Sequence, residues 1–265
     1  MSRPRRVRLV GIGCGHPDQL TVEAVAALRS ASAALVTVKR GNGRNGTDPL
    51  AAARRAILDH HAPGLPVVEV TDPDRDRSPA STATRAGYEG VVADWHEARA
   101  AAWADALRAH WSRGAGVEGG DVAILVWGDP GFYDSTIRVV ERVLARGDLG
   151  FDWDVLPGIS ALQLLAARHR IVLHEVGQPI HVTTERRLRE AVADGQPNIA
   201  VFLTSGTDLT GLDDWHVWWG ANLGSPSERL VAGRAADVAA RVADARAAAK
   251  AEAGWVMDLF LLRRP

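Results

Sequence analysis

The sequence is poor in cysteine, methionine, tyrosine and lysine. It has 265 residues with one cysteine, two methionines and two tyrosines, and only Lys39 and Lys250 among its 31 basic residues are lysines. The single cysteine, Cys14, excludes an intramolecular disulfide framework and fits a reducing compartment. The sequence also lacks a signal-peptide core and a long apolar run. We therefore expect a cytoplasmic protein with no membrane partner.

The charges of the chain are almost balanced, with 31 Lys and Arg against 32 Asp and Glu and a formal net charge of -1. A protein that coats nucleic acid carries a large basic excess, so we expect no nucleic-acid partner. Overall balance still permits arginines to gather locally. The hydrophobic fraction of 46% supplies a substantial core, and the length suits one large domain or two smaller ones.

Apolar runs alternate with amphipathic stretches, a pattern typical of an α/β protein. In the first half we predict strands at 7–12, 34–38, 66–70, 121–127 and 152–156, and helices at 22–28, 49–59, 88–111 and 135–145. The charged, turn-rich segment 72–85 predicts a mobile loop. After a helix at 160–167, strands prevail at 180–183, 199–203, 216–219, 228–231 and 255–262, with one helix at 235–250. We therefore predict two α/β domains, 1–156 and 157–265.

Glycine-containing loops directly follow three of the predicted strands. They read Gly11-Ile-Gly-Cys-Gly-His-Pro-Asp18, Gly128-Asp-Pro-Gly131 and Pro157-Gly-Ile-Ser160. Ligands of α/β proteins collect at the carboxyl ends of strands, and glycine lets a backbone approach a ligand closely. Any one loop could be an ordinary turn, but three after three strands indicate a binding site.

The first loop permits a dinucleotide-binding reading. It lacks the spacing of the dinucleotide fingerprint, and the next strand ends in Lys39-Arg40 where an acid would hold a ribose. Those cations could hold a 2′-phosphate, so an NADP-dependent oxidoreductase remains an alternative. Metal and serine-hydrolase chemistry are disfavoured, because the histidines lack metal-site spacing and Ser160 is not in a nucleophile elbow.

The three loops together carry a family resemblance. In order and spacing, Gly11 to Thr21, Gly128-Asp-Pro130 and Pro157-Gly-Ile-Ser-Ala161 resemble the tetrapyrrole (corrin/porphyrin) methyltransferases, and the resemblance runs from Val7 to about Arg263. It implies two α/β domains with an active-site cleft between them, S-adenosylmethionine as the methyl donor and a homodimer. The N-terminal domain would lie on the substrate side, and the C-terminal domain would help form the pocket for S-adenosylmethionine.

Further segments resemble one branch of this family, which methylates precorrin-5 at C-1 and releases acetate during cobalamin biosynthesis. They are Arg75-Asp-Arg-Ser78, Asp94-Trp-His96, Val126-Trp-Gly-Asp-Pro130, Tyr133-Asp-Ser-Thr136, Ala166-Ala-Arg-His-Arg-Ile171, Trp219-Gly-Ala221, Leu223-Gly224 and Gly254-Trp-Val-Met-Asp258. A methyltransferase of the same fold that acts at another corrin carbon is the alternative within the family.

The resemblance also implies site residues. The cofactor pocket would be lined by Pro17, Gly128, Asp129, Phe132, Tyr133, Ser160, Ala161, Thr204 and Gly233. Acetate release calls for water attack, which a positioned acid or base assists. The candidates for catalysis are His16, Asp18 and Tyr133, with Asp94 and His96 as further acids or bases.

Arginines are the natural partners of a substrate with many carboxylates, because the guanidinium binds carboxylate in a bidentate manner. The candidates lie in the predicted mobile loop and after the third glycine loop: Arg75, Arg77, Arg85, Arg168 and Arg170. For each of them a solvated surface position is the alternative.

One residue departs from the family pattern. The first loop of the family usually reads Gly-Asp-Pro, and this chain has Gly15-His16-Pro17. His16 could take the role of the acid near neutral pH, because histidine titrates there. It could equally weaken activity, which leaves a non-catalytic binding protein as a third class of function.

Overall fold

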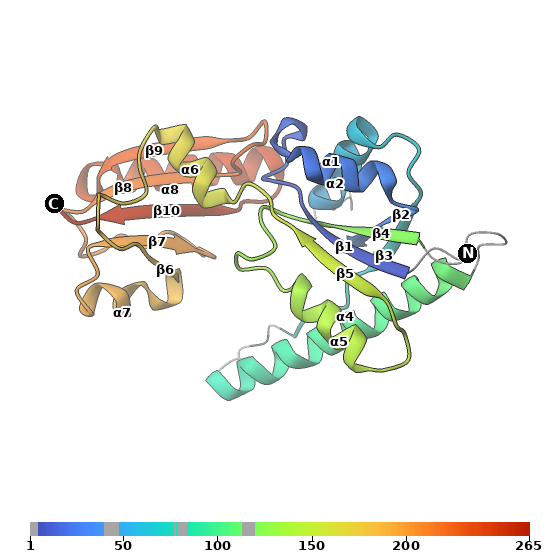
Figure 1. Ribbon diagram of the computed structural model, residues 1–265. Coiled ribbons are helices and arrows are strands. Elements are labelled where there is room, and N and C mark those ends of the chain that lie inside the picture. Colours follow the sequence, from blue (N-terminus) through green and yellow to red (C-terminus); the bar gives the residue numbers. More distant parts are fainter. Residues whose placement is uncertain (1–4, 40–47, 77, 79–83, 113–119) are drawn as a thin grey trace. The chain divides into compact units, whose positions relative to one another are not determined.

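The structure is a computed structural model that describes residues 5–39, 48–76, 78, 84–112 and 120–265. The chain forms two compact units (Figure 1). The first consists of the chain up to Gly13 together with Pro17–Gly158, and the second of Cys14–His16 together with Ile159–Pro265. Three residues of the first glycine loop thus belong to the second unit.

The first unit contains a parallel sheet of five strands. Their order is β3-β2-β4-β1-β5. The bounds are β1 Arg5–Gly11, β2 Ala33–Val38, β3 Val67–Thr71, β4 Gly120–Val126 and β5 Asp152–Leu156. All these pairings are parallel, so the carboxyl ends of the strands share one edge of the sheet.

Helices cover both faces of this sheet. The helices α1 (Val22–Ser30) and α2 (Pro49–His61) lie on one face, and α4 (Arg85–Ser112) and α5 (Thr136–Ala145) lie on the other (Figure 1). Two hydrophobic clusters correspond to the two faces. Trp103, Leu107 and Trp111 recur at every fourth position of α4, and all three are buried in the core.

The second unit contains a mixed sheet of five strands in the order β6-β7-β10-β8-β9. The bounds are β6 His181–Thr184, β7 Asn198–Phe202, β8 His216–Ala221, β9 Arg229–Arg234 and β10 Asp258–Arg263. The last strand of the chain lies between β7 and β8 and is antiparallel to both, while β6 and β7 are parallel.

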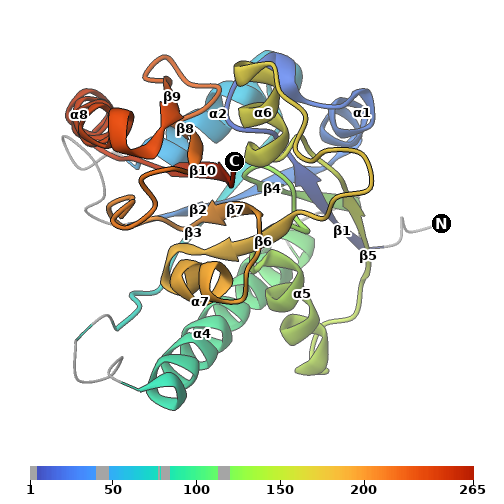
Figure 2. The same ribbon diagram turned by 90° about the vertical axis from the view of Figure 1, so that its left-hand side faces the viewer.

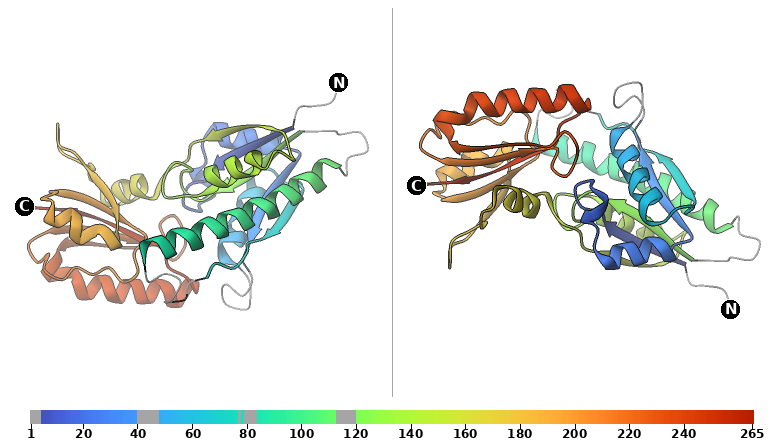
Figure 3. Two further views of the ribbon diagram at one scale, coloured as in Figure 1. Left: turned by 90° about the horizontal axis from the view of Figure 1, so that it is seen from below. Right: turned by 90° about the horizontal axis from the view of Figure 1, so that it is seen from above.

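Alternate residues of these strands face two different helix layers. One hydrophobic cluster joins the sheet to α7 (Leu188–Ala193) and α8 (Ala235–Ala253), and another joins it to α6 (Ala161–His169). Figures 2 and 3 show α6 and α8 on opposite faces of this sheet. The two units are thus an α/β parallel sheet and a mixed sheet with helices, as the predicted fold class requires.

Segment 72–85 differs in part from its prediction as a mobile loop. Its first residue, Asp72, is buried, its N–H donates to Val38 at 2.9 Å, and its carboxylate pairs with Arg99 at 2.8 Å. The start of the segment is therefore fixed to β2 and α4. Residues 77 and 79–83 lie outside the described part of the chain.

Among the helices of the described residues, none combines the length and the apolarity that crossing a bilayer requires.

Candidate functional site

The first two glycine loops are joined by backbone hydrogen bonds within the first unit. The N–H of Gly128 donates to Gly13 at 2.7 Å, and the N–H of Gly13 donates to Gly128 at 3.2 Å. Just before them, the N–H of Ile12 donates to Val126 at 2.9 Å. The ends of β1 and β4 therefore continue as one paired structure beyond the sheet.

The third glycine loop packs against the other two at a distance that only glycine allows. A Cβ atom on Gly158 would lie 2.2 Å from the carbonyl oxygen of Gly128, and one on Gly11 would lie 2.5 Å from the nitrogen of Gly158. Contacts this short displace backbone. The three loops after β1, β4 and β5 thus converge at one edge of the parallel sheet.

Asp129 holds the second and third loops together. Its Oδ2 accepts the N–H of Gly158 at 2.9 Å, and its Oδ1 accepts the N–H of Gly131 at 2.8 Å. Both carboxylate oxygens are thus engaged by the backbone. Asp129 therefore organises the loops, and its role as a cofactor ligand stays a prediction.

Two aromatic residues follow in the same loop. Phe132 is 37% exposed and Tyr133 is 46% exposed, and their rings lie 6.1 Å apart in an edge-to-face arrangement. The backbone of Tyr133 has φ of +50°, an unfavourable region for a residue with a side chain. Strain of this kind concentrates at ligand sites, so the aromatic pair is a candidate ligand surface beside Gly128.

After Cys14–His16 the chain rejoins the first unit at Pro17, where it contacts His61, a residue not among the predicted site residues. Pro17 begins a short 3₁₀ turn, and its carbonyl oxygen lies 2.8 Å from Nε2 of His61 at the end of α2. His16 and Asp18, on either side of Pro17, are exposed. The loop is therefore fixed at one end by Gly13 and at the other by His61. The link between His61 and Pro17 spans 44 positions, so no local signal in the sequence could have revealed it.

The other predicted pocket residues belong to the second unit. Ser160 is the N-cap of α6, where its hydroxyl accepts the N–H of Gln163 at 3.3 Å and the Gln163 side chain accepts the N–H of Ser160 at 2.9 Å. Ala161 is the first residue of that helix. The hydroxyl of Thr204, after β7, donates to the carbonyl oxygen of Asp258 at 3.3 Å.

Gly233 lies at the end of β9 with φ of +150°, and a Cβ atom there would lie 2.6 Å from Cγ1 of Val238. Cys14 packs into the core of the second unit, with its Sγ 4.0 Å from the carbonyl oxygen of Ile159. Burial raises the pKa of the Cys14 thiol to about 12, which makes it a poor nucleophile at neutral pH.

The predicted substrate arginines have different surroundings. The guanidinium of Arg75 lies 5.7 Å from the Trp95 ring centroid. Arg168 forms an ion pair with Glu228 at 2.9 Å, and Glu228 also accepts the N–H of Gly224 at 2.7 Å. Arg170 is exposed and ends α6 with φ of +56°. Arg77 and the side chain of Arg85 lie outside what the structure describes.

A charged and aromatic cluster on α4 was only partly anticipated. Arg99 lies between Trp95 and Trp103, with its guanidinium carbon 4.6 and 5.2 Å from the two ring centroids, and it pairs with Asp72. Asp94 is exposed, whereas His96 is buried. The signal available in the sequence was the spacing of Trp95, Arg99 and Trp103, which recur at every fourth position of the predicted helix.

Burial lowers the pKa of His96, and the positive charges of Arg142, Arg99, Arg138 and Arg75 lower it further. A neutral imidazole is therefore favoured at neutral pH. Two of these arginines have acidic partners, since Arg99 pairs with Asp72 and Arg142 with Glu97.

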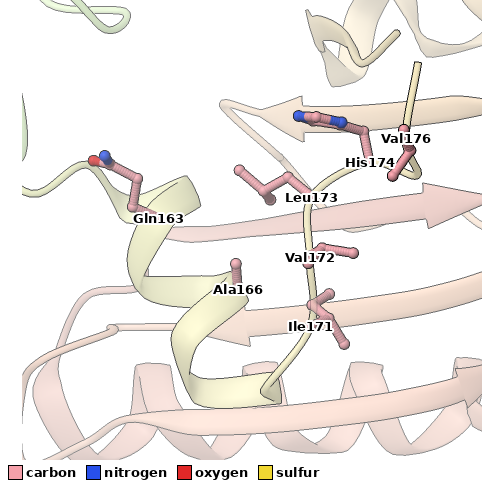
Figure 4. Close-up of a pocket in the computed structure, with 7 residues that line it drawn as sticks. All are labelled: Gln163, Ala166, Ile171, Val172, Leu173, His174 and Val176. Atoms are coloured by element: carbon pink, nitrogen blue, oxygen red, sulfur yellow. The ribbon is translucent and has the colours of Figure 1, made fainter. Parts of the chain in front are cut away.

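A separate hollow of about 520 Å³ lies in the second unit between α6 and the segment that follows it (Figure 4). Its lining is mainly apolar and comprises Gln163, Ala166, Ile171, Val172, Leu173, His174 and Val176. None of these is a predicted site residue, so the hollow is distinct from the converging loops.

The predicted site residues thus divide between the units. Pro17, Asp18, Gly128, Asp129, Phe132 and Tyr133 belong to the first, and His16, Ser160, Ala161, Thr204 and Gly233 belong to the second. Within the first unit, the second loop lies directly against the first and third.

Comparisons with known proteins agree with one another. A family model described as tetrapyrrole (corrin/porphyrin) methylases matches residues 6–239. The chain is 41% identical over 264 residues to a deacetylating precorrin-6A synthase from Sinorhizobium sp., and the match covers 98% of this chain and 95% of that protein.

Solved structures show the same relationship. A putative cobalamin synthesis related protein (CobF) from Corynebacterium diphtheriae matches with a TM-score of 0.80 and 36% identity over 99% of both chains. Uroporphyrin-III C-methyltransferase from Thermus thermophilus, solved in complex with S-adenosylhomocysteine, matches with a TM-score of 0.55 and 18% identity over 97% of this chain and 92% of that one. At that identity the second match shows the fold alone.

Proposed function

The chain belongs to the tetrapyrrole (corrin/porphyrin) methylase family, and we propose that it is a deacetylating precorrin-6A synthase. In this role it transfers a methyl group from S-adenosylmethionine to C-1 of precorrin-5 and releases acetate, giving precorrin-6A in cobalamin biosynthesis. The likeness to the deacetylating synthase from Sinorhizobium sp. extends over nearly the whole of both chains, and this observation carries the proposal.

The converging loops fit a bound S-adenosylmethionine, which supplies an electrophilic methyl group. Gly11 and Gly158 leave no room for a Cβ, so the loops form a compact backbone platform. Asp129 fixes that platform with both carboxylate oxygens, and the exposed rings of Phe132 and Tyr133 lie next to it. We propose that backbone groups of this platform bind the donor and that the rings pack against it.

Methyl transfer is an in-line displacement, so the protein chiefly has to align donor and acceptor and exclude water. Fixed loops do this better than mobile ones, and here hydrogen bonds fix Gly13, Gly128 and Gly158. No protein nucleophile is required. This agrees with the high pKa of the Cys14 thiol, the only cysteine of the chain.

Acetate release requires water to attack a carbonyl carbon, which a positioned acid or base assists. We propose His16 and Asp18 for this step, because both are exposed in the loop that Gly13 and His61 hold at its ends. Tyr133 is a further candidate, since its strained backbone presents the side chain at the second loop. Replacing His16 with Asp restores the usual family residue and tests whether the histidine is itself required.

The direct test is incubation of the purified chain with precorrin-5 and methyl-labelled S-adenosylmethionine. We expect one labelled methyl group in the product and one equivalent of free acetate. Methylation without acetate would assign the chain to another corrin carbon. The absence of both methylation and acetate release would favour a non-catalytic binding protein.

A thermal-shift measurement separates the methyltransferase from the oxidoreductase alternative. We expect S-adenosylhomocysteine to raise Tm and NADPH to leave it unchanged, because a ligand stabilises the state that it binds. Stabilisation by NADPH alone would reject the proposal. The homodimer and the cytoplasmic location are further proposals, for which light scattering and cell fractionation are the measurements.

A further inference from the structure

Arg54 on α2 is attached to the end of β4. Its Nε donates to the carbonyl oxygen of Leu125 at 3.1 Å, and Leu125 is the next-to-last residue of that strand. The side chain is partly buried, and burial lowers the pKa of its guanidinium. In the described part of the chain, no acidic side chain forms an ion pair with Arg54.

The acidic residues whose charges act on Arg54 are engaged elsewhere. Asp48 and Asp134 accept backbone N–H groups at the starts of α2 and α5, and Asp72 pairs with Arg99 at 2.8 Å. By contrast, another partly buried arginine has its own partner, since Arg246 pairs with Asp258 at 3.1 Å. These carboxylates stabilise the charge of Arg54 without pairing with it, so the terminal nitrogens of its guanidinium can take a further carboxylate as a direct partner.

Beside Arg54, the neighbouring strands β2 and β4 are no longer paired with each other. Strands β2 and β4 pair only through Ala33–Leu35 and Val122–Ile124, whereas β1 pairs with β4 as far as Val126. Strand β2 continues into α2 on one face of the sheet, and β4 continues into α5 on the opposite face (Figure 1). Such a topological switch point at the carboxyl edge is where open α/β sheets bind ligands.

The position also suits the size of the proposed substrate. Leu125 precedes Gly128 by three residues, which limits their separation to about 10 Å. Acid side chains surround a tetrapyrrole ring, so a ring held near the glycine loops can place one of them at this switch point. The terminal nitrogens of Arg54 remain for such a group, and a guanidinium fork matches a carboxylate.

We propose that Arg54 binds a peripheral carboxylate of the tetrapyrrole substrate. This inference rests on the proposed function for the identity of the ligand. It adds a binding residue that lies outside the arginines predicted from the sequence.

The test compares Arg54→Met with Arg55→Met in the full chain. Both variants remove one positive charge from α2, but Arg55 is exposed and pairs with Glu69 on β3. We expect Arg54→Met to raise KM for precorrin-5 about 10- to 100-fold, the range for a lost hydrogen bond to a charged group. The kcat and the Kd for S-adenosylhomocysteine should stay close to the wild-type values, and Arg55→Met should behave as the wild type.

Binding of uroporphyrin III, a stable porphyrin with carboxylates around the ring, gives a second readout that needs no turnover. Arg54→Lys keeps the charge and should recover part of the affinity that Arg54→Met loses. An unchanged Kd for uroporphyrin III together with an unchanged KM in Arg54→Met would overturn the inference. So would an equal weakening of porphyrin and S-adenosylhomocysteine binding with a lower Tm, because that pattern means a purely structural role.

The two proposals fail in different ways. A wild-type chain that neither methylates precorrin-5 nor releases acetate rejects the proposed function, and uroporphyrin III binding still tests Arg54. An active wild type with an unaffected Arg54→Met variant rejects only the role of Arg54.

Discussion

At the residue scale, the meeting of Gly11, Gly128 and Gly158 depends on the absence of side chains. The carbonyl oxygen of Gly128 occupies the space that a Cβ of Gly158 would need. Because backbone on three loops would have to move together, this contact has little capacity to adjust. A small chemical change there should have a large effect.

We therefore expect Gly158→Ala to destabilise the protein by roughly 3 kcal/mol or more, the range that marks strained or overpacked sites. Gly150→Ala is the control, since a Cβ there has no neighbour within 4 Å. Urea denaturation measures both. Equal unfolding free energies for the two variants would show that the loops adapt, contrary to the close contact.

His96 gives a residue-scale prediction about pH. Burial lowers its pKa in the folded state, so the unfolded chain binds the proton first as the pH falls below about 6.5. Stability from the neutral imidazole is present in full above that pH and is lost as the pH falls toward the folded pKa. We expect His96→Gln to lose less stability than the wild type between pH 7 and pH 5.

The measurement is the urea midpoint at several pH values, with the exposed His174 replaced by Gln as the control. Burial also lowers the pKa of His216, and this changes stability with pH in the same direction. The stability of His96→Gln should therefore still fall to some extent as the pH falls. Parallel pH profiles for the wild type and His96→Gln would contradict the prediction.

Sequence patterns revealed the positions of these site residues better than their roles. The glycines were visible because each follows an apolar run. The double acceptor role of Asp129 was not visible, because one of its partners, Gly158, is 29 positions away. His61 and Arg54 were missed for the same reason, since helix α2 brings them to Pro17 and Leu125 only in the folded unit.

At the element scale, Ser160 is both a predicted ligand of the cofactor and the observed N-cap of α6. The capping box at the start of α6 uses both its hydroxyl and its N–H. Removing an N-cap hydroxyl costs about 1 kcal/mol. We expect that loss in Ser160→Ala and almost none in Ser160→Thr, as measured by the free energy of unfolding.

The binding of S-adenosylhomocysteine to the same variants separates the two roles of Ser160. A weaker affinity in Ser160→Ala beyond its loss of stability would add a ligand contact to the cap. An unfolding free energy equal to that of the wild type would show that the cap contributes nothing to stability.

Most helices and strands were predictable because their local signals are strong. Buried strands read as apolar runs, and Asp48-Pro49 marks the start of α2 as a cap followed by a first-turn proline. Helix α7 was missed because Leu188–Ala193 is too short to show a period. The insertion of β10 between β7 and β8 depends on pairing across the chain, which local patterns do not encode.

At the scale of the whole molecule, the single cysteine gives a chemical reporter. Cys14 is 1% exposed, and burial raises the pKa of its thiol to about 12. Because the thiolate is the reactive form, we expect iodoacetamide at pH 8 to label the native chain far more slowly than the chain in urea. Mass spectrometry after timed quenching measures the rate, and equal rates in the two conditions would contradict the burial of Cys14.

The sequence predicts one domain boundary, between residues 156 and 157. The assignment of Cys14–His16 to the second unit was therefore not anticipated. Its local signal is a glycine loop after β1, and nothing local shows which core receives the thiol. Tertiary packing with Leu162, Leu165 and their neighbours decides it.

The assignment of Cys14–His16 to the second unit limits how this chain can be combined with relatives in a chimera. A single crossover at the Gly158–Ile159 bond would exchange 159–265 between relatives but leave Cys14–His16 with its original parent. The transplanted unit would then receive a foreign side chain in its core. Chimeras should therefore succeed more often when residues 14–16 are inherited together with 159–265, so the unit of exchange is discontinuous in the gene.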